Sequence, residues 1–126
     1  MLYHESSLEL LSALNIGFWT LEVAKKNDTR QMFFDDTMCR LLSAPDLASP
    51  GDRYEYMFSR ISCNYKDKVK SAFVNMIDKN SIIQVEFPWK HPNKGEIELR
   101  LSGIVIEDTA CRIVFKGYCR LLSQNK

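Results

Sequence analysis

The sequence predicts an α+β fold, in which a five-stranded antiparallel sheet carries short helices on one face and forms a cavity with them. Two observations predict this architecture. Apolar and polar residues alternate strictly near the beginning of the chain and again over its last third, a pattern that is typical of half-buried strands. Between these two regions, apolar residues recur at the spacing of amphipathic helices. Because short turns separate the last three strands, we expect them to pair antiparallel.

The bulk composition is that of one compact domain. The chain has 126 residues, of which 45% are hydrophobic and 26% charged, so it can bury a core without metals or disulfides. A formal net charge of +1 excludes the basic footprint of a nucleic-acid-binding protein. The sequence has no apolar run long enough for a membrane helix, and its acidic beginning, MLYHESSLELL, is no secretory signal. We therefore expect a cytoplasmic location and reduced thiols.

The first elements are a flanking helix and a hairpin. Ser6 and Glu9 form a capping-box pattern, which predicts an amphipathic helix over residues 5–14, ahead of a domain spanning 15–123. IGFWTLEVA then alternates, with Trp19 on the face opposite Phe18, and predicts a strand. KKNDT is a polar turn, and RQMFF resumes as the partner strand. Since a lone hairpin is marginal in water, this pair should extend the sheet of the C-terminal strands.

The middle of the chain predicts three helices. Asp35 or Asp36 can cap a short helix whose inward stripe is Met38, Leu41 and Leu42. The sequence SPGD supplies a serine cap and a proline at the first helical position for the next helix. Asn64 is expected to cap a third helix, which Lys79-Asn80 ends. The lysines at 66, 68 and 70 are interpreted as the solvated face of that helix.

The remaining segments are strands. SIIQVEFPW carries Pro88 near its end, which indicates an edge strand or an exit from the sheet. EIELRLSGIVI alternates, and Gly103 within it predicts a bulge or a close backbone approach. CRIVFKGYCRLL is the last strand. The pentapeptide CRLLS occurs at 39–43 and at 119–123, once in a predicted helix and once in a predicted strand, so it is no structural repeat.

The order of these elements, together with several short motifs, resembles a PAS domain, in particular the subgroup found in bacterial sensor histidine kinases and diguanylate cyclases. The motifs are IGFWTLEV, DDTMCRLL, YEYMFSRI, the pattern N-x-x-D-K-V-x-x-A-F, and WKHPNKGEIELRLSG, and the match covers about residues 15–122. The turn HPNKGE departs from the Asp-Gly turn of many members, and CRLLSQNK departs from the usual Asp-Ile-Thr ending.

The resemblance implies a sensory or dimerisation module of a two-component or related signal transduction system. Such a module is not an enzyme itself, and it passes a signal to an attached kinase or cyclase in a longer parent protein. It binds a small molecule in the cavity or pairs with another PAS domain. The expected partners are therefore a second copy of the chain, an output domain and a small hydrophobic ligand. The segment before residue 15 resembles the flanking helix through which many PAS domains form dimers, and the interface candidates are Leu8, Leu11, Leu14 and Phe18.

Heme and flavin are not expected as cofactors, and no metal site or catalytic set is expected either. Cys39 follows the second strand directly, whereas the reactive cysteine of the flavin light sensors lies on a later helix. The long helix lacks the histidine that ligates heme in PAS sensors, and His91 is interpreted as a solvated turn residue. The identity of any ligand stays open.

The expected cavity has a mixed aromatic and methionine lining. Alternatively, these side chains simply fill the core. Tyr54 can place a hydroxyl inside the cavity, and Arg100 a charge at its rim. The candidate lining residues are Trp19, Met32, Phe34, Leu42, Tyr54, Met57, Phe58, Phe73, Met76, Val85, Phe87, Leu99 and Phe115. A second hypothesis is a small cavity enzyme, which needs a buried carboxylate, and only Asp36 and Glu86 could point inward.

Overall fold

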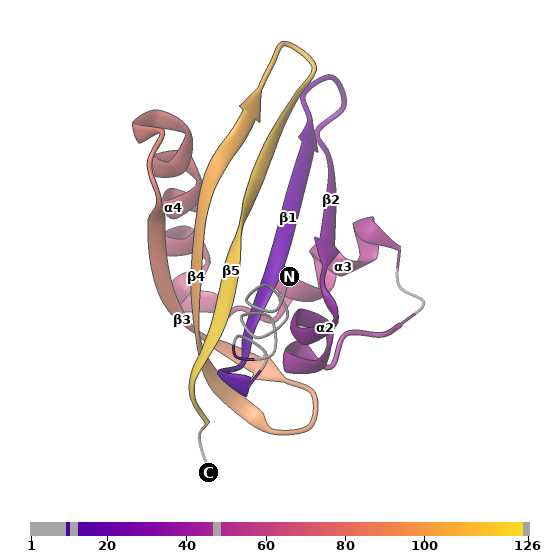
Figure 1. Ribbon diagram of the computed structural model, residues 1–126, viewed down its shortest axis with the longest axis vertical. Coiled ribbons are helices and arrows are strands. Elements are labelled where there is room, and N and C mark those ends of the chain that lie inside the picture. Colours follow the sequence, from indigo (N-terminus) through magenta and orange to yellow (C-terminus); the bar gives the residue numbers. More distant parts are fainter. Residues whose placement is uncertain (1–9, 11–12, 47–48, 125–126) are drawn as a thin grey trace.

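The computed structural model describes residue 10 and residues 13–46 and 49–124. The described elements, in chain order, are β1 (Ile16–Ala24), β2 (Thr29–Phe34), α2 (Asp36–Leu42), α3 (Pro50–Ser59), a short 3₁₀ turn η1 (Cys63–Tyr65), α4 (Lys66–Lys79), β3 (Ile83–His91), β4 (Gly95–Asp108) and β5 (Arg112–Gln124). The strands form one five-stranded antiparallel sheet in the order β2-β1-β5-β4-β3, with the three helices behind it in the view of Figure 1. The predicted fold class is confirmed.

Local sequence signals position the helices as predicted. The Asp35 carboxylate accepts hydrogen bonds from the backbone N–H groups of Met38 (2.8 Å) and Phe18 (3.1 Å), so the cap of α2 is also tied to the beginning of β1. Ser49 caps α3 by accepting from Asp52 N at 3.1 Å. Asn80 ends α4 with a left-handed backbone, φ 48°. The prediction for Asn64 is wrong, because it lies inside η1 and α4 begins without a side-chain cap.

The predicted flanking helix, residues 5–14, falls almost wholly outside the described residues. Its last turn is described in part, where Leu14 N donates a hydrogen bond to Leu10 O at 3.0 Å. Leu8 and Leu11 are not described, whereas the side chains of Leu14 and Phe18 are 45% and 39% exposed. The helix therefore stays a prediction over most of its length.

Three glycines allow backbones to approach closely. A Cβ on Gly17 would lie 2.6 Å from Met38 Cα, so α2 packs directly on the backbone of β1. Gly103 and Gly117 are partners on β4 and β5. A Cβ on Gly103 would lie 2.7 Å from the Trp19 ring. Of the two predicted alternatives for Gly103, a bulge or a close approach to its backbone, the structure shows the close approach. The register shifts of β4 occur elsewhere, at Glu98/Leu99 and Val105/Glu107.

The core lies between the inner face of the sheet and the helices. Alternation along β1 places Trp19 and Leu21 on the inner face. Pro88 lies on β3, which is an edge strand, one of the two alternatives that this proline indicated. The largest side chains with less than 2% exposure are Trp19, Trp89, Phe87, Met32, Met38, Leu42, Met57, Met76, Ile97, Leu99, Leu101 and Val69.

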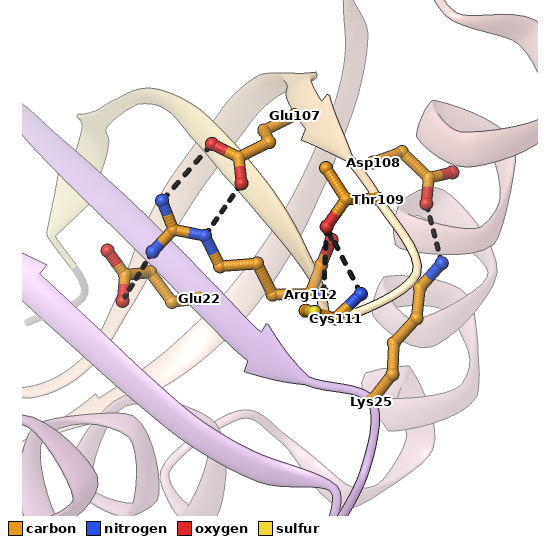
Figure 2. Close-up of polar contacts among 7 residues, drawn as sticks. All are labelled: Glu22, Lys25, Glu107, Asp108, Thr109, Cys111 and Arg112. Atoms are coloured by element: carbon orange, nitrogen blue, oxygen red, sulfur yellow. Dashed lines mark hydrogen bonds and ion pairs between the residues drawn. The ribbon is translucent and has the colours of Figure 1, made fainter.

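Ion pairs on the other face link three strands near the turn between β4 and β5 (Figure 2). Arg112 of β5 donates two hydrogen bonds to Glu107 of β4, at 2.7 and 3.1 Å, and lies 3.7 Å from a carboxylate oxygen of Glu22 on β1. The hydrogen bonds from Arg112 lower the pKa of Glu107. A separate ion pair joins Lys25, directly after β1, to Asp108 of β4 at 2.7 Å, and Asp108 is the register partner of the cavity-lining Ile113. Because these side chains are exposed or half-buried, their ion pairs contribute little to stability.

His91 corrects an expectation, because it is buried rather than solvated. It is only 4% exposed, at the end of β3, where Nδ1 accepts hydrogen bonds from the backbone N–H groups of Asn93 (3.0 Å) and Lys94 (3.1 Å). A further hydrogen bond joins the ring to the backbone of Leu41. Burial, followed by the charges of Lys94 and Arg60, lowers the pKa of His91. The neutral ring thus closes the turn between β3 and β4.

We expect this histidine to make the protein less stable in mild acid. In the unfolded chain the pKa of histidine is about 6.5, so between that value and the lowered pKa the unfolded state binds more protons than the native state. The stability that His91 contributes is complete above this window and is lost as the pH falls through it. In urea unfolding at about pH 7.5 and 5.5, the wild type should lose more stability on acidification than His91→Gln. Equal losses in the two proteins would contradict this role.

Candidate functional site

The described part of the chain contains an open cavity of about 660 Å³ between the sheet and the helices α3 and α4. Leu21 and Val23 of β1 and Ile113 and Phe115 of β5 contribute its sheet side. Phe58 of α3 and Phe73 of α4 contribute its helix side. A volume of this size is typical of pockets for small organic molecules.

Aromatic rings connect the walls of this cavity. The Tyr54 and Phe58 ring centroids are 4.6 Å apart within α3, and Phe58 lies 5.8 Å from Phe73 on α4. Phe73 then meets Phe115 on β5 edge to face at 5.0 Å. Phe73 also packs against the buried ring of Trp19 at 5.8 Å. Because one ladder of rings joins both helices to the sheet, a ligand that displaces Phe73 would act on all three elements.

Charged and polar side chains surround the apolar part of the cavity. Arg30 of β2 donates a hydrogen bond from Nη1 to the Tyr54 hydroxyl at 2.7 Å, and this bond raises the pKa of Arg30. Lys66 and Lys70 line the cavity from α4, and Glu55 from α3. Lys66 Nζ lies 3.4 Å from the carbonyl oxygen of Ser59, the last residue of α3. The cavity therefore combines an apolar interior with a charged surround.

The candidate lining residues divide into two groups. Four of them, Tyr54, Phe58, Phe73 and Phe115, do line the cavity. The others fill the core, which was the alternative left open by the sequence, or lie near a separate hollow. Phe34 borders the separate hollow of about 420 Å³. The other candidates are completely or almost completely buried in the core: Trp19, Met32, Leu42, Met57, Met76, Val85, Phe87 and Leu99.

Sequence reasoning missed much of the helix wall. The lysines of α4 were interpreted as a solvated face, and Lys68 and Lys70 are indeed exposed, but Lys66 and Lys70 also line the open cavity. Lys68 lies elsewhere, 5.4 Å over the Tyr65 ring. The signal was a stripe of mixed chemistry, because Lys66, Lys70 and Val74 follow one another at four-residue spacing on one side of the helix. A search for purely apolar stripes passes over such a pattern.

The two carboxylates that the enzyme hypothesis named do not lie inside the larger cavity, and Glu55, which does line it, is exposed rather than buried. Glu86 is exposed on β3, where it accepts hydrogen bonds from Arg100 at 2.8 and 2.9 Å. Arg100 is therefore paired on this face and not at the rim of the cavity. Asp36 is exposed in the first turn of α2 and borders the separate hollow. Neither acid lines the larger cavity.

The cysteines provide no paired site. Cys39, Cys63, Cys111 and Cys119 are all free thiols. Complete burial raises the pKa of Cys119 to about 12, so this thiol is unreactive at neutral pH. Within residue 10 and residues 13–46 and 49–124, no three His, Cys, Asp or Glu side chains gather as a metal site would require. In the same part of the chain, no helix is long and apolar enough to span a membrane.

Comparisons with known proteins identify the fold. No family model matches the sequence, and a search of curated proteins gives no significant match. Solved structures do match, at low identity. A sensory box histidine kinase/response regulator from Burkholderia thailandensis is 14% identical with a TM-score of 0.68, over 93% of this chain and 84% of that one. The N-terminal domain of a diguanylate cyclase with PAS/PAC sensor from Marinobacter aquaeolei is 11% identical with a TM-score of 0.60, over 84% and 95%.

A third match agrees with these two. A PAS domain from a two-component sensor histidine kinase is 14% identical with a TM-score of 0.54, over 96% of this chain and 97% of that one. The strand order and the helices on one face, together with these matches, show that the chain has the PAS fold. The resemblance inferred from the sequence motifs is thereby confirmed at the level of the fold.

Proposed function

We propose that the chain is a non-catalytic PAS sensor module of a cytoplasmic signal transduction protein. It binds a small, largely apolar ligand in the cavity between α3, α4 and the sheet, forms a dimer, and relays the signal to an attached output domain such as a kinase or cyclase. The observation that carries the proposal is an open cavity of about 660 Å³ with an aromatic interior in a PAS fold. A concave site of this size, with an apolar wall and a few polar groups around it, is typical of small-molecule binding sites.

Native mass spectrometry of the freshly purified protein, beside its denatured mass, tests the ligand and the dimer together. We expect an additional small mass that is lost on denaturation, and a subunit count of two. The variant Ile113→Trp fills the cavity and should lose this additional mass. If the variant retains the same small molecule, the ligand binds elsewhere. Monomers without any retained or added small molecule would contradict both parts of the proposal.

The dimer is proposed to form through the flanking segment and the beginning of β1. Phe18 is 39% exposed on the outer face of the sheet, and Phe33 of the neighbouring β2 is 38% exposed on that face. Leu14, 45% exposed, precedes them in the chain, and the predicted helical residues Leu8 and Leu11 would continue the apolar surface. Burying each such side chain contributes about 1.5–3 kcal/mol, which is enough to make a dimer of several of them.

Phe18→Lys should therefore weaken the dimer at least about tenfold, because it removes one buried aromatic side chain and introduces an unpaired charge. Analytical ultracentrifugation measures the effect. Ile106→Lys is the matched control. Ile106 is 56% exposed and lies at the register shift near the C-terminal end of β4, outside the proposed interface. Equal dimer dissociation constants for the wild type and Phe18→Lys would show that the interface lies elsewhere.

A further inference from the structure

The charges around the cavity identify a class of ligand more narrowly than its apolar interior does. Three cationic side chains line the cavity, Arg30, Lys66 and Lys70, against the single carboxylate of Glu55. The whole protein carries a net charge of only +1, so this part of the surface is more positive than the average. An uncharged apolar ligand would gain nothing from this arrangement.

Two of these cations are not neutralised by a carboxylate within the described residues. Lys66 reaches only a neutral acceptor, Ser59 O at 3.4 Å. Lys70 is exposed and makes no hydrogen bond or ion pair with any residue that the structure describes. Arg30, in contrast, is shared between the Tyr54 hydroxyl and Asp28, whose carboxylate lies 3.3 Å away. The unpaired positive charge is therefore concentrated on α4.

The backbone of α4 adds to this charge. Lys66 is the first residue of a 14-residue helix, so the positive end of the helix dipole lies beside the lysine that lines the cavity. Beyond the lysines along the same helix come Phe73, Val74 and Ile77, which are apolar and also line the cavity. One helix thus presents a cationic end and an apolar end to the same space.

We propose that the ligand of this cavity is an amphiphilic monocarboxylate, with its apolar body against Phe73 and Phe115 and its carboxylate toward Lys66 and Lys70. This inference rests on the proposed function, because it names the class of ligand for the same cavity. A carboxylate at this place would pair with two ammonium groups that have no carboxylate partner among the described residues, while its apolar body would cover the aromatic ladder. Ligand binding would then be coupled to the position of α4 relative to the sheet.

Isothermal titration calorimetry with three probes of equal chain length tests the proposal: decanoate, decanol and decylamine. Decanoate should bind at least about tenfold more tightly than the other two, and its affinity should fall with salt. Decanol binding as tightly as decanoate would overturn the proposed charge preference and leave the proposed ligand cavity intact. Tighter binding of decylamine than of decanoate would likewise overturn the proposed preference for a negatively charged ligand. No binding of any probe would contradict the proposal and count against the ligand-binding part of the proposed function.

Charge variants provide the second test. The double variant Lys66→Gln/Lys70→Gln should lower the affinity for decanoate about tenfold and leave the affinity for decanol unchanged, because it removes charge and little apolar surface. Glu55→Gln should have the opposite effect and raise the affinity for decanoate about threefold, because it removes the carboxylate that lines the cavity. Lys68→Gln is the matched control on the same helix, since Lys68 lies over Tyr65 and does not line the cavity. Decanoate affinity that is equal in the double variant and in Lys68→Gln would overturn the proposed placement of the carboxylate.

Discussion

Gly117→Ala is expected to destabilise the protein by at least about 3 kcal/mol and to lower its melting temperature by about 10 °C or more. The new Cβ would overlap the carbonyl oxygen of Ser102 and would lie 2.7 Å from Gly103 Cα. Both neighbours are backbone atoms of β4, so the clash cannot be relieved by rotating a side chain. The central strands β4 and β5 would have to separate, where Trp19 packs over Gly103.

Gly51→Ala is the control for this change. Gly51 is the second residue of α3, and a Cβ there would meet nothing closer than 3.9 Å. Alanine favours helix over glycine, so this variant should be unchanged or more stable by up to about 1 kcal/mol. Thermal unfolding followed by circular dichroism measures both proteins. A Gly117→Ala protein as stable as Gly51→Ala would contradict the close approach of β4 and β5.

Trp89→Ala is expected to cost about 3–5 kcal/mol of stability, the second large effect. Trp89 is completely buried on β3, and its Nε1 donates a hydrogen bond to the carbonyl oxygen of Met57 in α3 at 2.8 Å. Its ring meets Tyr56 edge to face at 5.8 Å. The backbone bridge between Ile61 and Trp89 joins the segment directly after α3 to the same strand. This tryptophan therefore holds α3, one wall of the cavity, against the sheet.

A pair of phenylalanine variants separates the hydrogen bond from the loss of volume. Trp89→Phe removes a satisfied donor and leaves Met57 O without it, whereas Trp19→Phe removes an indole N–H that is buried without a hydrogen-bond partner. We therefore expect Trp89→Phe to be the more destabilising of the two by about 1 kcal/mol in urea unfolding. Equal losses, or a larger loss for Trp19→Phe, would show that the Met57 bond contributes nothing.

The fold was predictable from the sequence because its determinants are local. Asp35, one of the two predicted caps of α2, Ser49 and Asn80 cap their helices through backbone groups within a few residues of themselves, as the sequence predicted. Alternation in the strands likewise identifies the inner face without any knowledge of the partner strand. Asn64 failed as a cap because the chain enters α4 through a 3₁₀ turn, an alternative that a capping residue alone does not exclude.

The candidate site was less predictable because it depends on contacts between distant segments. Whether Met57 or Phe58 faces the cavity is decided by the way α3 packs on β2, and both residues are apolar. His91 looked like a turn residue because its neighbours are polar, yet α2 covers it, and its ring donates a hydrogen bond to the backbone of Leu41 in that helix. The place of Lys70 at the cavity likewise depends on distant segments, because the sheet side of the cavity comes from β1 and β5, which are far from α4 in the sequence.

Methyl NMR with selectively labelled isoleucines tests most directly the claim that the cavity binds a ligand. Ile61, Ile77 and Ile113 line the cavity, whereas Ile104 and Ile106 lie on β4 away from it. Titration with decanoate, and separately with decanol, should shift the signals of the first three and leave the last two unchanged. Shifts confined to Ile104 and Ile106, or no shift with either compound, would contradict a ligand site between α3, α4 and the sheet.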